Sequence, residues 1–271
     1  MTKDARLFPA LLRHWRARHG LSQLDLALAA DVSARHVSFL ETGRAHPSRD
    51  MVLRLGATLG VPLRDQNALL QAAGYAPAFP EPQVGELPGP ITQAIERMLA
   101  QQEPFPMTVL DRTYGVVRVN AAARRTLLQF VKEPAAMTAP PNVFALLFDP
   151  ALARTYIQEW ERVAHTLVGR LHREVLARPE DGDLSALLES LFRYPGVPGG
   201  WRQPDFSLPS EPTLELRFRK PGLDLGFLTT IAVFNAPQNV TLEELRIESY
   251  FPLDEQTARE CRRLSVATGG S

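Results

Sequence analysis

Apolar residues recur at helical spacing in five short stretches near the start of the chain. Leu12 and Trp15 belong to the first apolar stripe, and Val37 and Leu40 lie on one side of a later stretch. Recurrence at three- and four-residue intervals is typical of amphipathic helices that share a core. The pattern therefore predicts a small all-helical domain of five helices over residues 1–75.

Two of the predicted helices fall within residues 21–47, LSQLDLALAADVSARHVSFLETGRAHP. Ser22 and Asp25 have the spacing of a capping box, in which each side chain accepts a hydrogen bond from the other residue's backbone N–H. The first of the two helices is therefore expected to begin here. Its apolar face is expected to comprise Leu24, Ala27 and Leu28.

A tight turn separates these two helices. Asp31 tolerates the left-handed backbone conformation that such a turn requires, and Val32 is expected to fill the space between the helices. Ser33 is expected to cap the second helix, over residues 34–41, whose outward face carries hydrogen-bond donors. A helix of this kind suits the major groove of DNA, where base edges present many acceptors. The stretch thus predicts a DNA-binding helix-turn-helix.

The pattern changes in the rest of the chain. Residues 76–90 hold five prolines and two glycines without sustained periodicity, which predicts a linker. A long amphipathic helix is expected at residues 155–176. Alternating apolar and polar residues predict strands at 106–111, 115–120, 213–220, 225–235 and 247–253. Residues 91–265 are therefore expected to form a mixed α/β domain around an antiparallel sheet.

The charge distribution is compatible with a basic DNA-binding domain. The 271-residue chain holds 30 Lys and Arg and 30 Asp and Glu, so its formal net charge is zero. Residues 1–80 hold 10 basic and 6 acidic residues, whereas residues 81–271 hold 20 and 24. This asymmetry fits a basic domain joined to a mildly acidic body. DNA affinity is expected to fall with salt, because phosphate neutralisation releases counterions.

The composition also excludes several classes of protein. Cys261 is the only cysteine, which excludes an intramolecular disulfide and a zinc site built on several cysteines. No run of about 18 apolar residues occurs, so no membrane span is expected. The N-terminal residues lack the continuous apolar segment of a secretion signal, and a cytoplasmic protein is expected.

Three motifs give the helix-turn-helix stretch a family resemblance. LSQ at 21–23, VS at 32–33 and F-L-E-x-G-R at 39–44, followed by P-S, resemble the Cro/C1-type (XRE) helix-turn-helix family over residues 11–74. The chain departs from that family at Asp31, where glycine is common. The resemblance implies a DNA-binding transcriptional regulator.

The same resemblance implies a set of DNA contacts. Gln23 would donate to a phosphate, Arg35 would face base edges and Arg44 would contact the DNA backbone. For Phe39, packing within the domain is the alternative. The full candidate set is Gln23, Ser33, Arg35, His36, Phe39 and Arg44. Because one recognition helix contacts only a half-site, a homodimer on a palindromic operator is expected.

The later part of the chain has a second resemblance. The segments LDRTYGVVRVNAAARRTLL, NVFALLFDP and WERVAHTLVGRL resemble the MmyB-like ligand-binding domain, which implies a PAS-like fold and a fatty-acid-like ligand. Many relatives carry a W-x-x-H segment and an H-P pair. This chain has Trp201 followed by Arg202, Gln203 and Pro204, and a Pro221–Gly222 pair instead. Ligand contacts by those histidines are therefore not carried over.

A PAS-like cup lined by apolar side chains suits a small hydrophobic molecule. The alternative for each aromatic candidate is a place in the ordinary core, and no cofactor is expected. The ligand-binding candidates are Phe144, Tyr156, Trp160 and Phe192.

The chain lacks the residue patterns of an enzyme. Glu161, His165 and His172 share a predicted helix, but no further ligand follows at a recognised metal-binding spacing. No nucleophile elbow, P-loop or dinucleotide fingerprint occurs. The favoured function is a one-component regulator that is controlled by a ligand. The alternatives are a DNA-tethered protein-interaction module without a small-molecule ligand and, less favoured, an enzyme fused to a DNA-binding domain.

Overall fold

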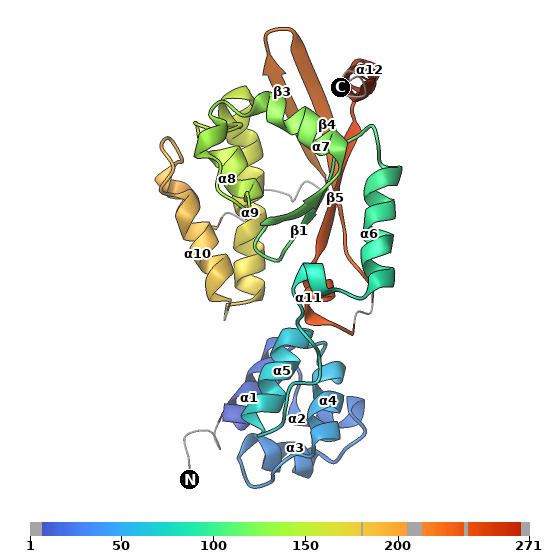
Figure 1. The fold of residues 1–271 in the computed structure, drawn as a ribbon. Coiled ribbons are helices and arrows are strands. Elements are labelled where there is room, and N and C mark those ends of the chain that lie inside the picture. Colours follow the sequence, from blue (N-terminus) through green and yellow to red (C-terminus); the bar gives the residue numbers. More distant parts are fainter. Residues whose placement is uncertain (1–6, 180, 205–212, 236–237, 267–271) are drawn as a thin grey trace. The chain divides into compact units, whose positions relative to one another are not determined.

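The computed structural model describes residues 7–179, 181–204, 213–235 and 238–266 (Figure 1). Contacts within the chain divide it into two compact units. Unit 1 comprises Met1–Gln83 and Phe234–Glu243, and unit 2 comprises Val84–Val233 and Glu244–Ser271. No helix in the described part is both long and apolar enough to cross a membrane.

Five α-helices form the described part of unit 1 up to residue 83, which confirms the predicted all-helical domain (Figure 1). Their apolar faces meet in one core, in which Leu26, Val37, Leu40 and Leu70 are fully buried. The helices are α1 (Leu7–Arg18), α2 (Gln23–Ala29), α3 (Ala34–Glu41), α4 (Arg49–Thr58) and α5 (Leu63–Ala72).

The predicted apolar face of α2 is wrong for Leu24 and Leu28 and confirmed for Ala27. Leu24 and Leu28 are 56% and 73% exposed, whereas Leu26, Ala27 and Ala30 are buried. The segment LDLALAA is apolar on nearly every side, so periodicity over a seven-residue helix cannot select the buried face. The contact of α2 with its neighbours selects the face that carries small alanines.

The caps and the turn around α2 and α3 agree with the sequence. Ser22 and Asp25 form the expected capping box at the start of α2. Asp31 has a φ of 52°, in the left-handed region, and Val32 packs against the core. The Ser33 hydroxyl accepts a hydrogen bond from the His36 backbone N–H and caps α3.

Unit 2 contains a five-stranded antiparallel sheet among its described residues, with the order β2-β1-β5-β4-β3. This sheet, with helices between β2 and β3, confirms the expected PAS-like mixed fold. The last strand along the chain, β5, lies at the centre of the sheet between β1 and β4. The strands are β1 (Met107–Leu110), β2 (Val116–Val119), β3 (Leu214–Lys220), β4 (Leu223–Ala232) and β5 (Arg246–Pro252).

Helices lie on both sides of this sheet in Figure 1, but one face is partly open, since Glu215, Arg217 and Arg219 of β3 and Phe251 of β5 are exposed. On one side lie α8 (Val143–Phe148), α9 (Trp160–Ala177) and α10 (Gly182–Leu191), and on the other lie α6 (Gly89–Gln101) and α12 (Glu255–Val266). The remaining helices are α7 (Ala121–Leu127), α11 (Val240–Glu244) and the 3-10 segments η2 (Val84–Glu86), η3 (Leu128–Phe130), η4 (Pro134–Ala136), η5 (Arg154–Tyr156) and η6 (Gly199–Arg202).

Two details of unit 2 differ from the sequence prediction. The long helix begins at Trp160 and not at residue 155, because Glu159 has a left-handed φ of 50° and Ile157 pairs with Phe218 of β3. The helix α12 after β5 was not predicted. Its buried side chains, which include Cys261, fit an amphipathic helix whose apolar positions are few.

The connection between β4 and β5 contributes residues 234–243 to unit 1. Within that unit, the Val240 backbone N–H donates to the Pro80 carbonyl at 3.0 Å. The Glu243 carboxylate accepts from the Leu63 backbone N–H at 2.9 Å, at the start of α5. Since the N-cap residue Pro62 makes no side-chain cap, Glu243 supplies one from a distant part of the chain.

Candidate DNA interface and ligand pocket

The exposed face of α3 brings three candidate DNA-binding residues together. The guanidinium carbon of Arg35 lies 5.1 Å from the centre of the Phe39 ring, and that of Arg44 lies 6.0 Å from it. Both arginines are exposed, and Phe39 is half-buried. A cation is attracted to the face of an aromatic ring at such distances. Phe39 therefore packs against two arginines, and its contact with DNA stays a prediction.

Ser33 and His36 lie at the start of the same helix. The Ser33 side chain is exposed and serves as the α3 cap, while the His36 side chain is half-buried. A cap of this kind fixes where the recognition helix starts and therefore which side chains its first turn presents.

Gln23 is held by a buried carboxylate. The Gln23 side-chain amide donates to Glu41 at 2.8 Å, and the Arg16 guanidinium donates to both Glu41 oxygens at 2.6 and 2.9 Å. Glu41 is 2% exposed. Sequence reasoning missed Arg16 and Glu41 as positioning residues, although Glu41 stands in the F-L-E-x-G-R motif.

The charge state of Glu41 follows from these contacts. Burial alone would raise the pKa of the Glu41 carboxyl. Hydrogen bonds from Arg16 and Gln23, with the positive charges of Arg16 and Arg13, outweigh burial and lower this pKa below its ordinary value. Glu41 is therefore ionised at neutral pH and fixes the end of α3 against α1 and the start of α2.

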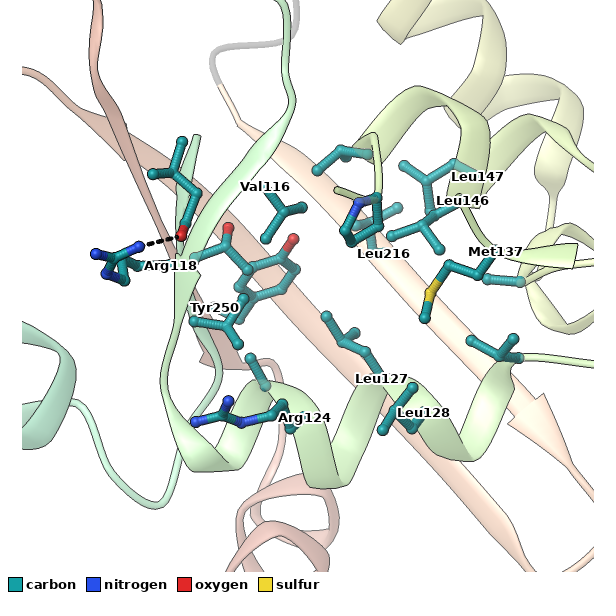
Figure 2. Close-up of a pocket in the computed structure, with 18 of the residues that line it drawn as sticks. Val116, Arg118, Arg124, Leu127, Leu128, Met137, Leu146, Leu147, Leu216 and Tyr250 are labelled. Atoms are coloured by element: carbon teal, nitrogen blue, oxygen red, sulfur yellow. Dashed lines mark hydrogen bonds between the residues drawn. The ribbon is translucent and has the colours of Figure 1, made fainter. Parts of the chain in front are cut away.

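A pocket of about 620 Å³ lies in unit 2. Figure 2 shows Leu127, Leu128, Met137, Leu146 and Leu147 around one part of it, and Arg118, Arg124 and Tyr250 around another. The volume falls within the range of about 300–1,000 Å³ that is typical of small-molecule sites, and such sites are mainly apolar with a few polar groups. The pocket is therefore large enough for an amphiphilic molecule, and its apolar and polar side chains line different parts of it.

The polar part of the pocket contains two kinds of groups. Arg118 and Arg124 are exposed cations, and the Nε of Arg118 lies 3.8 Å from the Glu96 carboxylate. Arg124 makes no ion pair within the described ranges. Thr108 and Tyr250 are buried neutral groups. The polar part of the pocket thus offers both positive charges and neutral hydrogen-bonding groups.

Tyr250 connects the pocket to a buried acid. Its hydroxyl donates to the Glu248 carboxylate at 2.9 Å, and Glu248 is 5% exposed. Burial raises the pKa of Glu248, against the opposing effects of the Tyr250 hydrogen bond and the Arg170 charge. Burial and Glu248 also raise the pKa of Tyr250, and hydrogen bonding from the nearby Thr108 hydroxyl opposes this increase. Even so, Thr108 makes no well-directed hydrogen bond within the described part of the chain.

Two family models match the chain. A helix-turn-helix model matches residues 12–66, and the model described as the MmyB-like transcription regulator ligand binding domain matches residues 91–264. The chain belongs to the MmyB-like transcription regulator family. It is thus a DNA-binding transcription regulator with a ligand-binding domain, and neither matched model describes a catalytic domain.

Other comparisons add little. Among solved structures, the chain is similar to an RNA-binding light-oxygen-voltage receptor, with 16% identity and a TM-score of 0.28. The alignment covers 93% of this chain, and the chain spans 65% of the length of that receptor chain. This similarity is too low to establish a shared fold. A comparison with curated proteins gives no match.

The four aromatic candidates of the ligand-binding domain lie outside the lining of the large pocket. Phe144 is buried edge-to-face against Tyr114, and Tyr156 packs against Phe130. The Trp160 indole N–H donates to the Leu147 carbonyl at 2.8 Å. These residues stabilise the core around the pocket, so their direct contact with a ligand stays a prediction.

Phe192 packs beneath the Arg202 guanidinium, whose carbon lies 4.8 Å from the ring centre. The pocket is lined instead by aliphatic side chains, two arginines and the aromatic residues Phe218 and Tyr250, all of which sequence reasoning missed. A signal was present in GVVRVN, because alternation places Val116 and Arg118 on one face of the predicted strand.

The described residues include a histidine and a cysteine whose surroundings bear on metal and thiol chemistry. Among the residues that it describes, no group of three or more His, Cys, Asp or Glu side chains is placed to hold a metal ion. The His172 Nε2 atom lies 2.8 Å from the Trp201 carbonyl oxygen, so this ring nitrogen already has a hydrogen-bond partner in the backbone. Burial and the charge of Glu260 raise the pKa of the Cys261 thiol to about 11, so it is protonated at neutral pH.

Proposed function

We propose that the chain is a one-component transcriptional regulator that binds a palindromic operator as a homodimer and responds to a small hydrophobic, fatty-acid-like ligand. The single observation that carries the ligand part is the apolar pocket of about 620 Å³ in unit 2. In this proposal, residues 1–75 bind DNA and residues 91–265 bind the ligand.

The arrangement of α3 supports sequence-specific binding. The Phe39 ring restricts the Arg35 side chain, so less conformational freedom is lost when the guanidinium pairs with a base. A guanidinium can donate two hydrogen bonds to the O6 and N7 atoms of guanine in the major groove. Arg44 lies beyond the end of α3, where a phosphate contact would fix the register of the helix on DNA.

Two chain segments support a route for ligand control. The Pro-rich segment 76–90 leads from α5 to α6, and residues 234–243 connect β4 with β5 while packing in unit 1. Tyr250 of β5 lines the pocket, so a ligand that shifts β5 also shifts one end of this connection. We propose that ligand binding thereby changes the spacing of the two helix-turn-helix units in the dimer.

Selection of bound DNA from random oligonucleotides tests the DNA-binding part. The expected result is an inverted repeat, whose symmetry would also support the dimer. On the selected site, Arg35→Ala should weaken binding by roughly 1–3 kcal/mol and relax the preference at one base. Arg97→Ala, an exposed arginine on α6, is the matched control and should have little effect. An equal loss on random DNA would instead make Arg35 a phosphate contact.

Mass spectrometry of the denatured purified protein and thermal shift with dodecanoic acid test the ligand part. A co-purified apolar molecule, or a rise in melting temperature with dodecanoic acid, is expected. If neither occurs, the DNA-tethered protein-interaction module becomes the better function. Operator affinity is then compared with and without dodecanoic acid at equal salt, and identical values would contradict ligand control.

A further inference from the structure

The pocket contains a buried hydroxyl without a well-directed hydrogen bond, although the Tyr250 hydroxyl lies close to it. Thr108 lies on β1, is 2% exposed and lines the pocket. Among the buried side-chain polar atoms of the described residues, its Oγ1 atom is the one without a hydrogen bond. Leaving such a group unpaired destabilises a fold, and most buried polar atoms in proteins are paired. The hydroxyl therefore points to a group that enters the pocket.

A second oxygen lies beside this hydroxyl. Thr108 is the cross-strand partner of Glu248 on β5, and Tyr250 follows on the same face of β5. The Tyr250 proton is donated to Glu248, so the tyrosine oxygen can still accept a hydrogen bond. Thr108 can donate one. A hydroxyl group on the ligand fits this pair, because it can accept from Thr108 and donate to Tyr250.

A carboxylate fits the same position poorly. It could accept from Thr108 but could not donate to Tyr250, and the Glu248 carboxyl lies directly behind the tyrosine. The cations Arg118 and Arg124, which suit a negative charge, line the exposed part of the pocket instead. The polar part of the pocket therefore offers exposed cations for a negative charge and a buried, neutral pair for a hydroxyl.

We propose that Thr108 and Tyr250 form a hydroxyl-binding subsite, and that the ligand class is a hydroxylated acyl chain and not a plain one. The inference rests on the proposed function, since it names the chemistry of the ligand that controls the regulator. In this arrangement the acyl chain contacts Leu127, Met137 and Leu146, and the carboxylate lies near Arg124.

A positional series of ligands on the full-length protein tests the subsite. Affinity is measured by calorimetry for dodecanoic acid and for its 2-, 3- and 12-hydroxy derivatives. At least one hydroxy acid should bind up to about tenfold tighter than dodecanoic acid, the advantage of one added hydrogen bond. Thr108→Val should remove that advantage and change the affinity for dodecanoic acid by less than about twofold. Thr108→Ser, which keeps the hydroxyl, should retain it.

The melting temperature of the ligand-free protein gives an independent readout. Thr108→Val replaces an unpaired hydroxyl with a methyl group of similar size, so the melting temperature should rise. Thr229→Val is the matched control, because the Thr229 hydroxyl is also buried but donates to the Leu214 carbonyl at 3.2 Å. That variant should melt lower and keep the preference for hydroxy acids.

The outcomes separate the subsite from the function. Equal binding of all four acids would overturn the subsite and leave the ligand-responsive regulator intact. Binding of none of them would remove support from the proposed function itself. If Thr108→Val melts lower, as Thr229→Val does, the Thr108 hydroxyl is already paired, with Tyr250 or with water, and the subsite is wrong. The subsite is also wrong if Thr108→Val keeps the hydroxy-acid advantage.

Discussion

Among the described residues, each unit buries one glutamate, and the surroundings of the two glutamates shift their pKa values in opposite directions. In unit 1, the Glu41 carboxylate accepts two hydrogen bonds from the Arg16 guanidinium and one from the Gln23 amide, and these contacts lower its pKa. Glu248 in unit 2 meets the hydroxyl of Tyr250, and burial raises its pKa. The first is a buried ion, whereas the second tends toward its neutral form.

The difference separates a structural contact from a candidate binding site. A buried carboxylate whose oxygens are all paired holds helices in place, because no polar atom is left for another molecule. The group around Glu248 borders a pocket and leaves the Thr108 hydroxyl unpaired among the described residues. In this protein, a buried polar atom without a well-directed hydrogen bond beside a cavity is therefore a better sign of ligand binding than aromatic side chains.

Removal of Arg16 should have the largest effect. Arg16→Ala leaves Glu41 buried without its main partner and should destabilise unit 1 by roughly 3–5 kcal/mol. Hydrogen exchange of α3 amides in the full-length protein measures this. Arg13→Ala is the control, because the Arg13 side chain is 60% exposed, lies 4.0 Å from the carboxylate and donates only to the Glu41 backbone carbonyl at 2.9 Å. It should cost less than about 1 kcal/mol. Equal losses would show that Glu41 depends on overall charge and not on the Arg16 contact.

A matched pair of amide variants tests the comparison directly. Glu41→Gln removes charge-assisted hydrogen bonds and should cost roughly 2–3 kcal/mol in the stability of unit 1. Glu248→Gln replaces a carboxyl whose pKa is raised by burial, so less charge is lost, and it should change the stability of unit 2 by less than about 1 kcal/mol. Urea unfolding followed by hydrogen exchange separates the units. A larger loss for Glu248→Gln would reverse the comparison.

The two acids should also give opposite pH dependence. The lowered pKa of Glu41 stabilises unit 1 above the unfolded value of about 4.3, and this contribution is lost as pH falls through the folded pKa. The raised pKa of Glu248 stabilises unit 2 at low pH, and its contribution is lost as pH rises from the unfolded value through the folded pKa.

Each slope is at most about 1.4 kcal/mol per pH unit, the limit for one proton. The measurement compares the unfolding free energies of the wild type and of the two glutamine variants at several pH values. The Glu41→Gln difference should shrink on acidification, and slopes of the same sign for both sites would contradict the assigned charge states.

The smallest effect concerns a third glutamate, Glu243. Glu243→Ala removes the cap from the Leu63 backbone N–H and should weaken the start of α5 by about 1 kcal/mol. Hydrogen exchange at that amide is the measurement. Glu244→Ala is the neighbouring control, since its carboxylate lies 3.9 Å from Arg112 of unit 2, and α5 should be unchanged. Unchanged exchange in both variants would mean that Glu243 contributes nothing to α5.

Much of the DNA-binding unit could be predicted from sequence because its signals are local. Ser22, Asp31 and Ser33 each act on atoms within a few residues, and the structure has the cap, the left-handed turn and the helix start where these residues predict them. The exposed Leu24 and Leu28 show the limit of this reasoning. Which apolar side of α2 is buried depends on its neighbours and not on its own spacing.

In the ligand-binding domain, the presence of the strands was predictable and their arrangement was not. Alternation located the segments that become β1 to β5, but it carries no information on which strands pair. The tail segment around Tyr250 becomes the central strand and brings Tyr250 beside Thr108. The aromatic candidates pack in the core. Their residue type could not show this, since burial in the core and contact with a ligand favour the same residue types.

The sequence by itself thus determined the helix-turn-helix, its caps and turn, the strand segments and the family. Only the tertiary structure decided that Glu41 is paired with Arg16, 25 residues away, that Glu243 caps a helix 180 residues away, and that Thr108 faces a cavity. Caps and turns depend on hydrogen bonds between near neighbours, which the sequence displays directly. Buried pairs and pockets depend on groups that meet only when distant segments pack, and so their chemistry is set by the fold.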